Sequence, residues 1–95
     1  MYRIVKITDR NGNDKSEVMD ELRRVHPDLL GEIINEKLLD STLFLSCLCF
    51  LWHDDTNKML RTSCVLEVEK DLYSMIVTTM NSIYYFEKVN DEYKV

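Results

Sequence analysis

Thiol and imidazole side chains are the first candidates for chemistry in this sequence. The chain has three cysteines, Cys47, Cys49 and Cys64, and two histidines, His26 and His53. A structural zinc site uses four ligands, usually as closely spaced pairs on turns, whereas here one Cys-x-Cys pair lies inside a hydrophobic run. The odd number of cysteines also argues against a disulfide framework. We therefore predict no metal site and no cofactor, and we expect the cysteines to pack as small apolar side chains.

Catalytic arrangements are equally weak. A nucleophilic cysteine needs neighbouring cations that lower the pKa of its thiol, and Cys47 and Cys49 have none close by in the sequence. The His-Asp-Asp triplet at residues 53–55 contains catalytic residue types, but adjacent loop residues rarely converge as acid, base and nucleophile. Only Gly12 and Gly31 are glycines, which excludes a glycine-rich phosphate loop. The sequence therefore predicts a protein that is not an enzyme.

Arg61, Thr62 and Ser63 form the most site-like polar triplet. A guanidinium beside two hydroxyls could hold a phosphate or a carboxylate, as in a protein that sequesters a nucleotide signal. The alternative, which we favour, is a turn whose hydroxyls satisfy local backbone groups.

Acidic residues recur at a regular spacing in the middle of the chain. The first group is Asp28, Glu32, Glu36 and Asp40, and the second includes Asp54 and Asp55. On a helix such side chains lie about 5 to 6 Å apart, and along one strand face about 7 Å apart, which resembles phosphate spacing in a nucleic-acid strand. These carboxylates could imitate a nucleic acid and bind a basic partner. An ordinary solvated surface explains the same charges.

The chain length and composition predict one small globular domain over residues 1–95, with 90–95 as a frayed tail. Of the 95 residues, 45% are hydrophobic and 31% charged, and the net charge is -5. This negative charge disfavours direct binding to nucleic acid. Residues 1–6 lack the apolar core of a signal peptide, and the apolar run at 43–52 is about half of the roughly 20 residues that a membrane helix needs. We expect a cytoplasmic protein that does not enter a membrane.

The apolar run belongs to a predicted strand at residues 42–52. In a strand Cys47, Cys49 and Leu51 share one face, and Phe50 and Trp52 share the other with further apolar residues. Because both faces are apolar, the strand is either central and covered by a helix, or it offers an apolar patch to a partner. We expect Phe50 and Trp52 to lie in the core beneath the helix. If the helix packs elsewhere, these two aromatics become anchors of a binding surface.

The N-terminal part predicts a strand, a turn and a helix. Residues 2–8 alternate as a strand does, and Asn-Gly at 11–12 signals a tight turn. An amphipathic helix follows at about residues 15–25. Asp14 and Glu17 have the spacing of a capping box at its start, and Ser16 could instead cap a slightly later start. The proline that comes next should end the helix.

Residues 27–39 are ambiguous between helix and strand. Their apolar residues have helical spacing, but Gly31 would weaken a helix interior by about 1 kcal/mol relative to alanine. We favour a strand from Gly31 to about Lys37, followed by a turn at residues 38–41.

Residues 58–89 predict a β-meander. Val, Ile, Thr, Tyr and Phe are abundant here, and the segment contains neither proline nor glycine. Met80-Asn81 lies between two strand-like runs, and asparagine tolerates the positive φ of a two-residue hairpin turn.

Residues 59–68 and 77–87, and more loosely 2–7, resemble small and mostly uncharacterised proteins encoded by phages and prophages of Gram-positive bacteria. Such proteins look like small SH3-like barrels, in which Leu60 to Ser63 would form a short helical turn between two strands. The present sequence departs from that pattern in the helix-like insertion after its first turn. The resemblance implies an origin and a fold, and it carries no catalytic residue.

We therefore expect an α+β domain with a mostly antiparallel, bent sheet of five or six strands, or an SH3-like barrel, and one helix near residues 15–25. By resemblance, its expected function is to antagonise a host defence protein in the bacterial cytoplasm, as anti-CRISPR proteins do, with the acidic residues blocking a nucleic-acid site. The alternatives are a nucleotide sponge and a structural or oligomer-forming phage protein, and self-association remains open.

Overall fold

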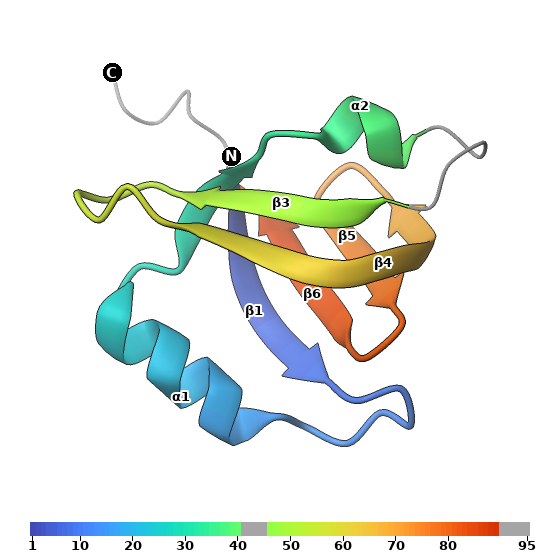
Figure 1. The fold of residues 1–95 in the computed structure, drawn as a ribbon, viewed down its shortest axis with the longest axis horizontal. Coiled ribbons are helices and arrows are strands. Elements are labelled where there is room, and N and C mark those ends of the chain that lie inside the picture. The colour runs from blue at the N-terminus through green and yellow to red at the C-terminus, as the bar shows by residue number, and fades with distance from the viewer. Residues whose placement is uncertain (41–45, 90–95) are drawn as a thin grey trace.

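Six strands form one antiparallel sheet that closes on itself (Figure 1). The computed structural model describes residues 1–40 and 46–89 of the chain. In order, the elements are β1 (Tyr2–Thr8), α1 (Ser16–Val25), β2 (Leu30–Ile33), α2 (Glu36–Leu39), β3 (Cys47–Trp52), β4 (Met59–Lys70), β5 (Ser74–Thr79) and β6 (Ile83–Lys88). Each strand pairs with the next one, and β6 returns to pair with β1. The expected mostly antiparallel sheet and the helix near residues 15–25 are confirmed, and α2 is an additional short helix.

The inner faces of the strands enclose one hydrophobic core. Ile4, Leu48, Phe50 and Phe86 come from three different strands, and each is at most 1% exposed. The ring of Phe50 lies 5.0 Å from that of Trp52 and 5.5 Å from that of Phe86, measured between centroids. Because side chains alternate between the two faces of a strand, β3 contributes every second residue to this core, namely Leu48, Phe50 and Trp52.

The longest strand, β4, bends at two points. Its register against β3 shifts between Arg61 and Cys64, and its register against β5 shifts between Val65 and Glu67. Such bulges bend a strand and increase its twist, which lets β4 pair with β3 along its first half and with β5 along its second. The predicted helical turn over Leu60 to Ser63 is wrong, because this segment lies inside β4.

Local hydrogen bonds set the turn between β1 and α1. The carboxylate of Asp9 accepts two backbone N–H groups of the turn, at 2.8 and 3.0 Å, and Gly12 has a φ of 89°. This confirms the turn predicted from Asn-Gly. The predicted capping box is wrong, because Lys15 is the N-cap of α1 and no side chain caps the helix. The carboxylate of Asp14 instead lies 3.5 Å from the ammonium of Lys6 on β1.

Residues 27–39 contain both a strand and a helix. The prediction of a strand from Gly31 to Lys37 is right only as far as Ile33, where β2 ends. The helix α2 begins at Glu36, so the rest of the predicted strand is wrong, and so is the first half of the predicted turn at 38–41. Asp40 lies in a turn as predicted, and residue 41 is outside the described residues.

Asn35 explains why β2 is short. Its side-chain amide donates to the carbonyl oxygen of Cys47 at 2.6 Å and accepts the backbone N–H of Cys49 at 3.0 Å. The side chain thus occupies the edge of β3 that a longer β2 would pair with, and the backbone is released to start α2.

The hairpin between β5 and β6 has the predicted two-residue turn at Met80-Asn81. The N–H of Thr79 donates to the carbonyl oxygen of Ser82 at 2.8 Å, which closes this turn. The expected positive φ at Asn81 is wrong, because the described residues with positive φ do not include it. The N–H of Met80 instead donates to the carbonyl oxygen of Cys64 at 3.0 Å, so β4 supports the turn.

Parts of two predicted segments fall outside the described residues. The strand expected at 42–52 is present from Cys47 to Trp52 as β3, and its beginning, 42–45, lies outside. The tail expected at 90–95 lies outside as well. Among the residues that the structure describes, no helix is long and apolar enough to cross a membrane.

Candidate functional site

Phe50 and Trp52 lie inside the closed sheet. Their side chains are 0% and 5% exposed, respectively. Trp52 also stacks on His26, which follows α1. Both aromatics are therefore core residues as expected, but the closed sheet covers them and not the helix, since α1 packs mainly on β1. Their alternative use as surface anchors does not fit this burial, because the inward face of β3 is covered by the rest of the closed sheet.

The opposite face of β3 points outward, and it is apolar. We refer to this surface as the β3 outer face. Its residues are Glu32 and Ile34 in and after β2, Cys47, Cys49 and Leu51 in β3, and Met59, Arg61 and Cys64 in β4. The strand register joins them into rows, because Leu51 pairs with Glu32 on one side and Met59 on the other. Cys49 similarly lies between Ile34, whose N–H donates to its carbonyl oxygen at 3.0 Å, and Arg61.

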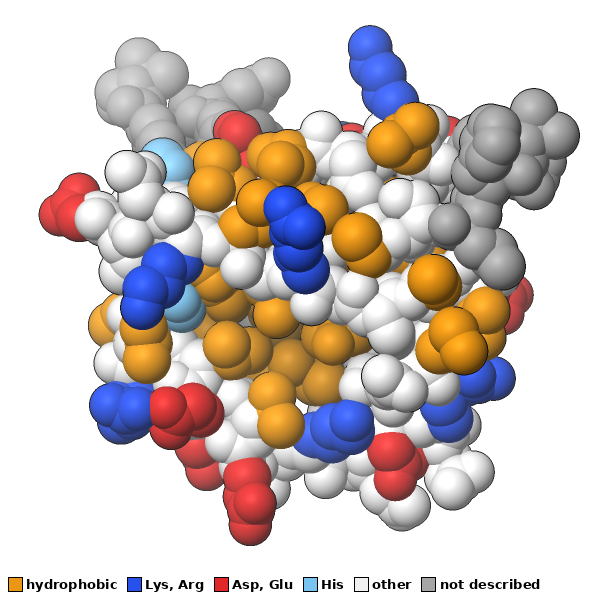
Figure 2. Space-filling view, in the orientation of Figure 1, with side chains coloured by type: hydrophobic (Ala, Val, Ile, Leu, Met, Phe, Trp, Pro, Cys, Tyr) orange, Lys and Arg blue, Asp and Glu red, His pale blue; other side chains and the backbone are white. Residues whose placement is uncertain are grey.

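Much of the β3 outer face is accessible. Ile34 is 54% exposed and Leu51 is 38% exposed. Neither α1 nor α2 crosses in front of β3 and β4 (Figure 1). Figure 2 shows hydrophobic side chains gathered around a basic side chain near the middle of this view. An accessible apolar sheet face with few charges is typical of a surface that contacts another protein.

Arg61, Thr62 and Ser63 do not converge on one ligand. Arg61 is exposed, whereas Thr62 is 8% exposed and its hydroxyl accepts the N–H of Leu48 at 2.9 Å. The hydroxyl of Ser63 accepts the N–H of Asn81 at 3.1 Å. The hydroxyls satisfy backbone groups, as in the favoured interpretation, but they do so from a strand and not from a turn. The predicted phosphate or carboxylate site is therefore not formed.

The three thiols belong to the β3 outer face and are half-buried. The sulfur atoms of Cys47 and Cys49 lie 3.8 Å apart, and Cys64 pairs with Cys47 across the strands. Burial of the Cys49 sulfur and its hydrogen bond with Cys47 raise the pKa of the Cys49 thiol. A raised pKa opposes nucleophilic chemistry. Within residues 1–40 and 46–89, no group of three or more His, Cys, Asp or Glu side chains could hold a metal ion.

The predicted acidic residues follow the line of β2 in three groups. Asp28 and Asp54 line one small hollow before the strand, and Asp55 follows Asp54 in the chain. Glu32 lies on β2 itself, and Glu36 and Asp40 lie at either end of α2. Half of these carboxylates have cationic or imidazole partners, namely Asp54, Glu36 and Asp40.

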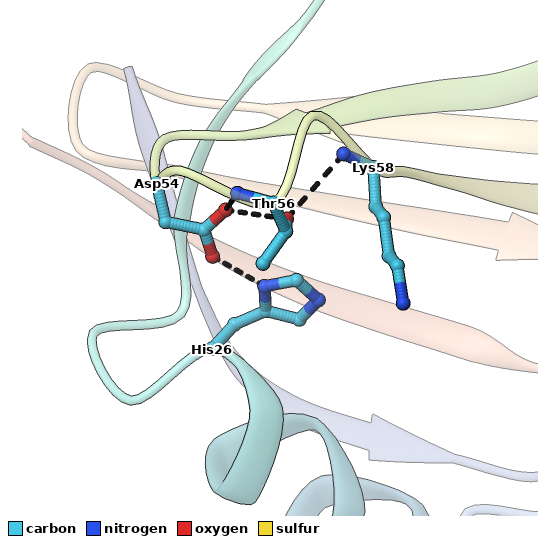
Figure 3. Close-up of polar contacts among 4 residues, drawn as sticks. All are labelled: His26, Asp54, Thr56 and Lys58. Atoms are coloured by element: carbon cyan, nitrogen blue, oxygen red, sulfur yellow. Dashed lines mark hydrogen bonds and ion pairs between the residues drawn. The ribbon is translucent and has the colours of Figure 1, made fainter.

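Asp54 connects the β3–β4 loop to the end of α1 (Figure 3). Its carboxylate accepts a hydrogen bond from Nδ1 of His26 and two from Thr56, from the backbone N–H at 2.9 Å and from the hydroxyl at 2.5 Å. The bonds from His26 and Thr56 lower the pKa of Asp54 to about 2. His26 is 5% exposed and stacked on Trp52. This histidine and carboxylate therefore hold two segments together, and the Thr56 hydroxyl drawn beside them donates to the carboxylate of Asp54.

Lys70 fastens the end of β4 to α2. Its ammonium lies 3.2 Å from Asp40 and 3.5 Å from Glu36. Glu36 also accepts a hydrogen bond from the hydroxyl of Tyr2 at 2.5 Å. The β4–β5 turn consequently lies next to α2, as Figure 1 shows.

The β4–β5 turn presents the two most exposed large hydrophobic side chains among the described residues. Leu72 is 78% exposed and Tyr73 is 75% exposed. The turn is well defined because the carboxylate of Asp71 accepts the N–H groups of Tyr73 at 2.7 Å and Ser74 at 2.8 Å. The sequence analysis missed this pair. Two large apolar residues between polar ones in a predicted turn are the signal that could have revealed them.

A cleft of about 390 Å³ separates α1 from β1. Val5 and Met19 form part of its wall, and Lys6 and Arg23 bring positive charge to it. Both cations already lie within 3.5 Å of carboxylates, Lys6 with Asp14 and Arg23 with Asp20. The cleft therefore offers no charge that requires a ligand.

Comparison with protein-family models, curated proteins and solved structures finds no match to this chain. The exposed surfaces described above are therefore the basis for assigning a function.

Proposed function

We propose that this protein is a non-enzymatic binding protein, encoded by a phage or another mobile element, that antagonises a host defence protein. The phage origin and the SH3-like class of its closed sheet rest on the sequence resemblance. One observation carries the binding role: Leu72 and Tyr73 protrude from a hydrogen-bonded turn that an ion pair holds beside the carboxylates of Glu36 and Asp40. We refer to these four residues, with the exposed Leu38, as the α2-end surface.

The α2-end surface combines the two properties that such an antagonist needs. Tyrosine and large aliphatic side chains contribute much of the binding energy when a partner buries them, and Leu38, Leu72 and Tyr73 are more than half exposed. The carboxylates of Glu36 and Asp40 favour a partner with a positive surface, such as the nucleic-acid channel of a nuclease.

The remaining predicted acidic residues extend the negative charge along β2. Asp28, Glu32 and Asp55 are exposed. No ion pair of theirs occurs among the described residues. A basic partner would meet the α2-end surface first and would be steered toward it by these charges, which makes the association rate sensitive to salt.

An immunity assay tests the proposal in cells. Bacteria with an active CRISPR system are challenged with a targeted phage, with and without the chain. We expect wild-type protein to restore plaque formation, and we expect Tyr73→Ala combined with Leu72→Ala to lose most of that effect. Met80→Ala is the matched control, because Met80 is 57% exposed at the β5–β6 hairpin turn of the same sheet. Equal activity of the double variant and wild type would contradict the proposed surface.

Charge reversal tests whether binding depends on the negative charge of the α2-end surface or only on the net charge of the protein. Asp40→Lys introduces a positive charge on the α2-end surface, and Glu67→Lys makes the same change at an exposed position on β4. We expect Asp40→Lys to reduce protection of the phage at least tenfold more than Glu67→Lys does. Equal losses would mean that net charge, and not this surface, determines binding.

A further inference from the structure

We infer that the β3 outer face is a dimer interface that binds the same face of a second copy of this chain. This inference goes beyond the proposed function, because the β3 outer face and the α2-end surface share no residue. It follows from where the face carries its two charges.

Glu32 and Arg61 are the two charged residues of the β3 outer face, and they lie on opposite sides of β3 in two neighbouring rows. Glu32 is beside Leu51 on the β2 side, and Arg61 is beside Cys49 on the β4 side. Leu51 and Cys49 are two residues apart on β3, so both lie between the two charged side chains. Both charged side chains are exposed, and neither has an ion-pair partner among the described residues.

A face with this arrangement is complementary to itself. In a two-fold symmetric dimer each contact occurs twice, with residue i on residue j′ and residue j on residue i′. The two-fold axis can lie in the plane of the interface, halfway between Glu32 and Arg61 and perpendicular to the line that joins them. Glu32 of each copy then meets Arg61 of the other. Two equivalent ion pairs then flank an apolar centre, which satisfies every charge that the face carries.

The centre supplies the hydrophobic contact. Leu51 and Ile34 are 38% and 54% exposed, and Cys49 and Met59 are half-buried next to them. Burial of apolar surface contributes roughly 25 cal/mol per Å². The face spans three strands, which lie about 4.8 Å apart, and it is therefore smaller than the roughly 800 Å² per partner of a standard interface. The dimer should accordingly depend on protein concentration and dissociate on dilution.

Sedimentation velocity of the purified chain, over a range of concentrations up to about 1 mM, tests the inference, because a weak dimer is populated at such concentrations. We expect wild type to pass from monomer to dimer. Glu32→Arg gives a face with two positive charges, and Arg61→Glu gives a face with two negative charges. Each variant alone should dimerise at least tenfold more weakly than wild type.

An equimolar mixture of the two variants is the decisive sample. Glu32→Arg and Arg61→Glu carry complementary faces, so the mixture should form a heterodimer with an affinity near that of wild type. The double variant Glu32→Arg/Arg61→Glu exchanges the two charges and should form a homodimer again. Glu67→Arg is the control for an added charge outside the face and should dimerise as wild type does.

Thiol accessibility gives an independent readout. Cys47, Cys49 and Cys64 all belong to the β3 outer face, so dimerisation should slow their alkylation by iodoacetamide at least several-fold between low and high protein concentration. A wild-type chain that remains monomeric at about 1 mM overturns the inference. So does a mixture of the two single variants that fails to associate, or a host protein that proves to occupy this face on the monomer. None of these results affects the immunity assay, which depends on the α2-end surface.

Discussion

The imidazole of His26 lies flat on the indole of Trp52, with ring centroids 3.9 Å apart and planes 7° apart. His26 follows the last residue of α1, and Trp52 is the last residue of β3. The stack therefore attaches the helix to the closed sheet, and Asp54 holds the imidazole in place from the next loop. An aromatic that the sequence offered as a binding anchor is thus used for internal packing.

Acid should weaken this attachment at a defined pH. The pKa of Asp54 is lowered from 3.8 to about 2 by its hydrogen bonds with His26 and Thr56. Since the folded state holds the charged carboxylate more strongly than the unfolded state does, its stabilisation is complete above about pH 4 and disappears as the pH falls through about 2. Denaturant unfolding at several pH values should show that Asp54→Asn lowers stability at pH 6 and removes most of this acid dependence.

Asp55→Asn is the control for Asp54→Asn, because Asp55 is an exposed neighbour in the same loop. It should leave both the stability at pH 6 and the acid dependence close to those of wild type. If both variants unfold with the same pH dependence as wild type, Asp54 does not stabilise the loop through its charge.

Gly31 should be sensitive to the smallest substitution. A Cβ atom at this position would lie 2.5 Å from the ring of Phe50 and even closer to the backbone carbonyl oxygen of Leu51. The backbone must shift to make room, so Gly31→Ala should lower the free energy of unfolding by about 1 to 3 kcal/mol. Urea unfolding measures the change. Gly12→Asn is the comparison for strain without a clash. Gly12 has open space around it, and asparagine reaches a positive φ more readily than most residues, so this variant should lose less stability than Gly31→Ala.

The side chain of Asn35 should stabilise the fold at the end of β2. Its amide satisfies the carbonyl oxygen of Cys47 and the N–H of Cys49, and Asn35→Ala leaves both without this partner. The expected loss is about 1 to 3 kcal/mol in the free energy of unfolding. Hydrogen exchange should also become faster at the Cys49 amide. Asn35→Asp keeps an acceptor for Cys49 and should recover protection there, whereas unchanged exchange in Asn35→Ala would exclude this role.

Tyr2 should titrate abnormally. Its burial, together with the hydrogen bond to Glu36 and the negative charges of Glu36 and Asp40, raises the pKa of the Tyr2 phenol above its ordinary value of 10.0. A raised pKa means that the neutral phenol stabilises the fold below pH 10 and that this contribution is lost at higher pH. Burial also raises the pKa of the Tyr84 phenol, so phenolate absorbance should show two tyrosines that ionise late. Tyr2→Phe should remove one of the two, and Glu36→Gln should shift one toward lower pH. The same number of late tyrosines in Tyr2→Phe and wild type would contradict the contact.

The sequence predicted the sheet well because its signals are local. The alternation of β-branched and aromatic residues after residue 58 gives β4, β5 and β6, and the turn at Met80-Asn81 lies where it was expected. The end of β2 was not predictable in this way. It depends on a side-chain contact between Asn35 and β3, more than ten residues away in the chain.

The candidate site was predicted only in part, for a similar reason. Alternation shows that both faces of β3 are apolar, but only the pairing of β6 with β1 determines which face is enclosed. The face with Phe50 and Trp52 became the core, and the face with Cys49 and Leu51 became the surface. The regular spacing of the acidic residues did not predict their placement, because Asp28 precedes β2, Glu32 lies on β2, and Glu36 and Asp40 lie at the ends of α2. Their partners, such as Lys70, come from distant strands and could not be inferred from spacing.

DNA cleavage by purified CRISPR effector complexes from Gram-positive bacteria, measured with increasing amounts of the chain, tests the central claim most directly. If the α2-end surface blocks a basic nucleic-acid site, wild type should inhibit cleavage by at least one complex, and inhibition should weaken as salt rises. The Leu72→Ala/Tyr73→Ala variant should inhibit at least tenfold less well than Met80→Ala. Unimpaired cleavage by every complex at low salt would contradict the proposed function.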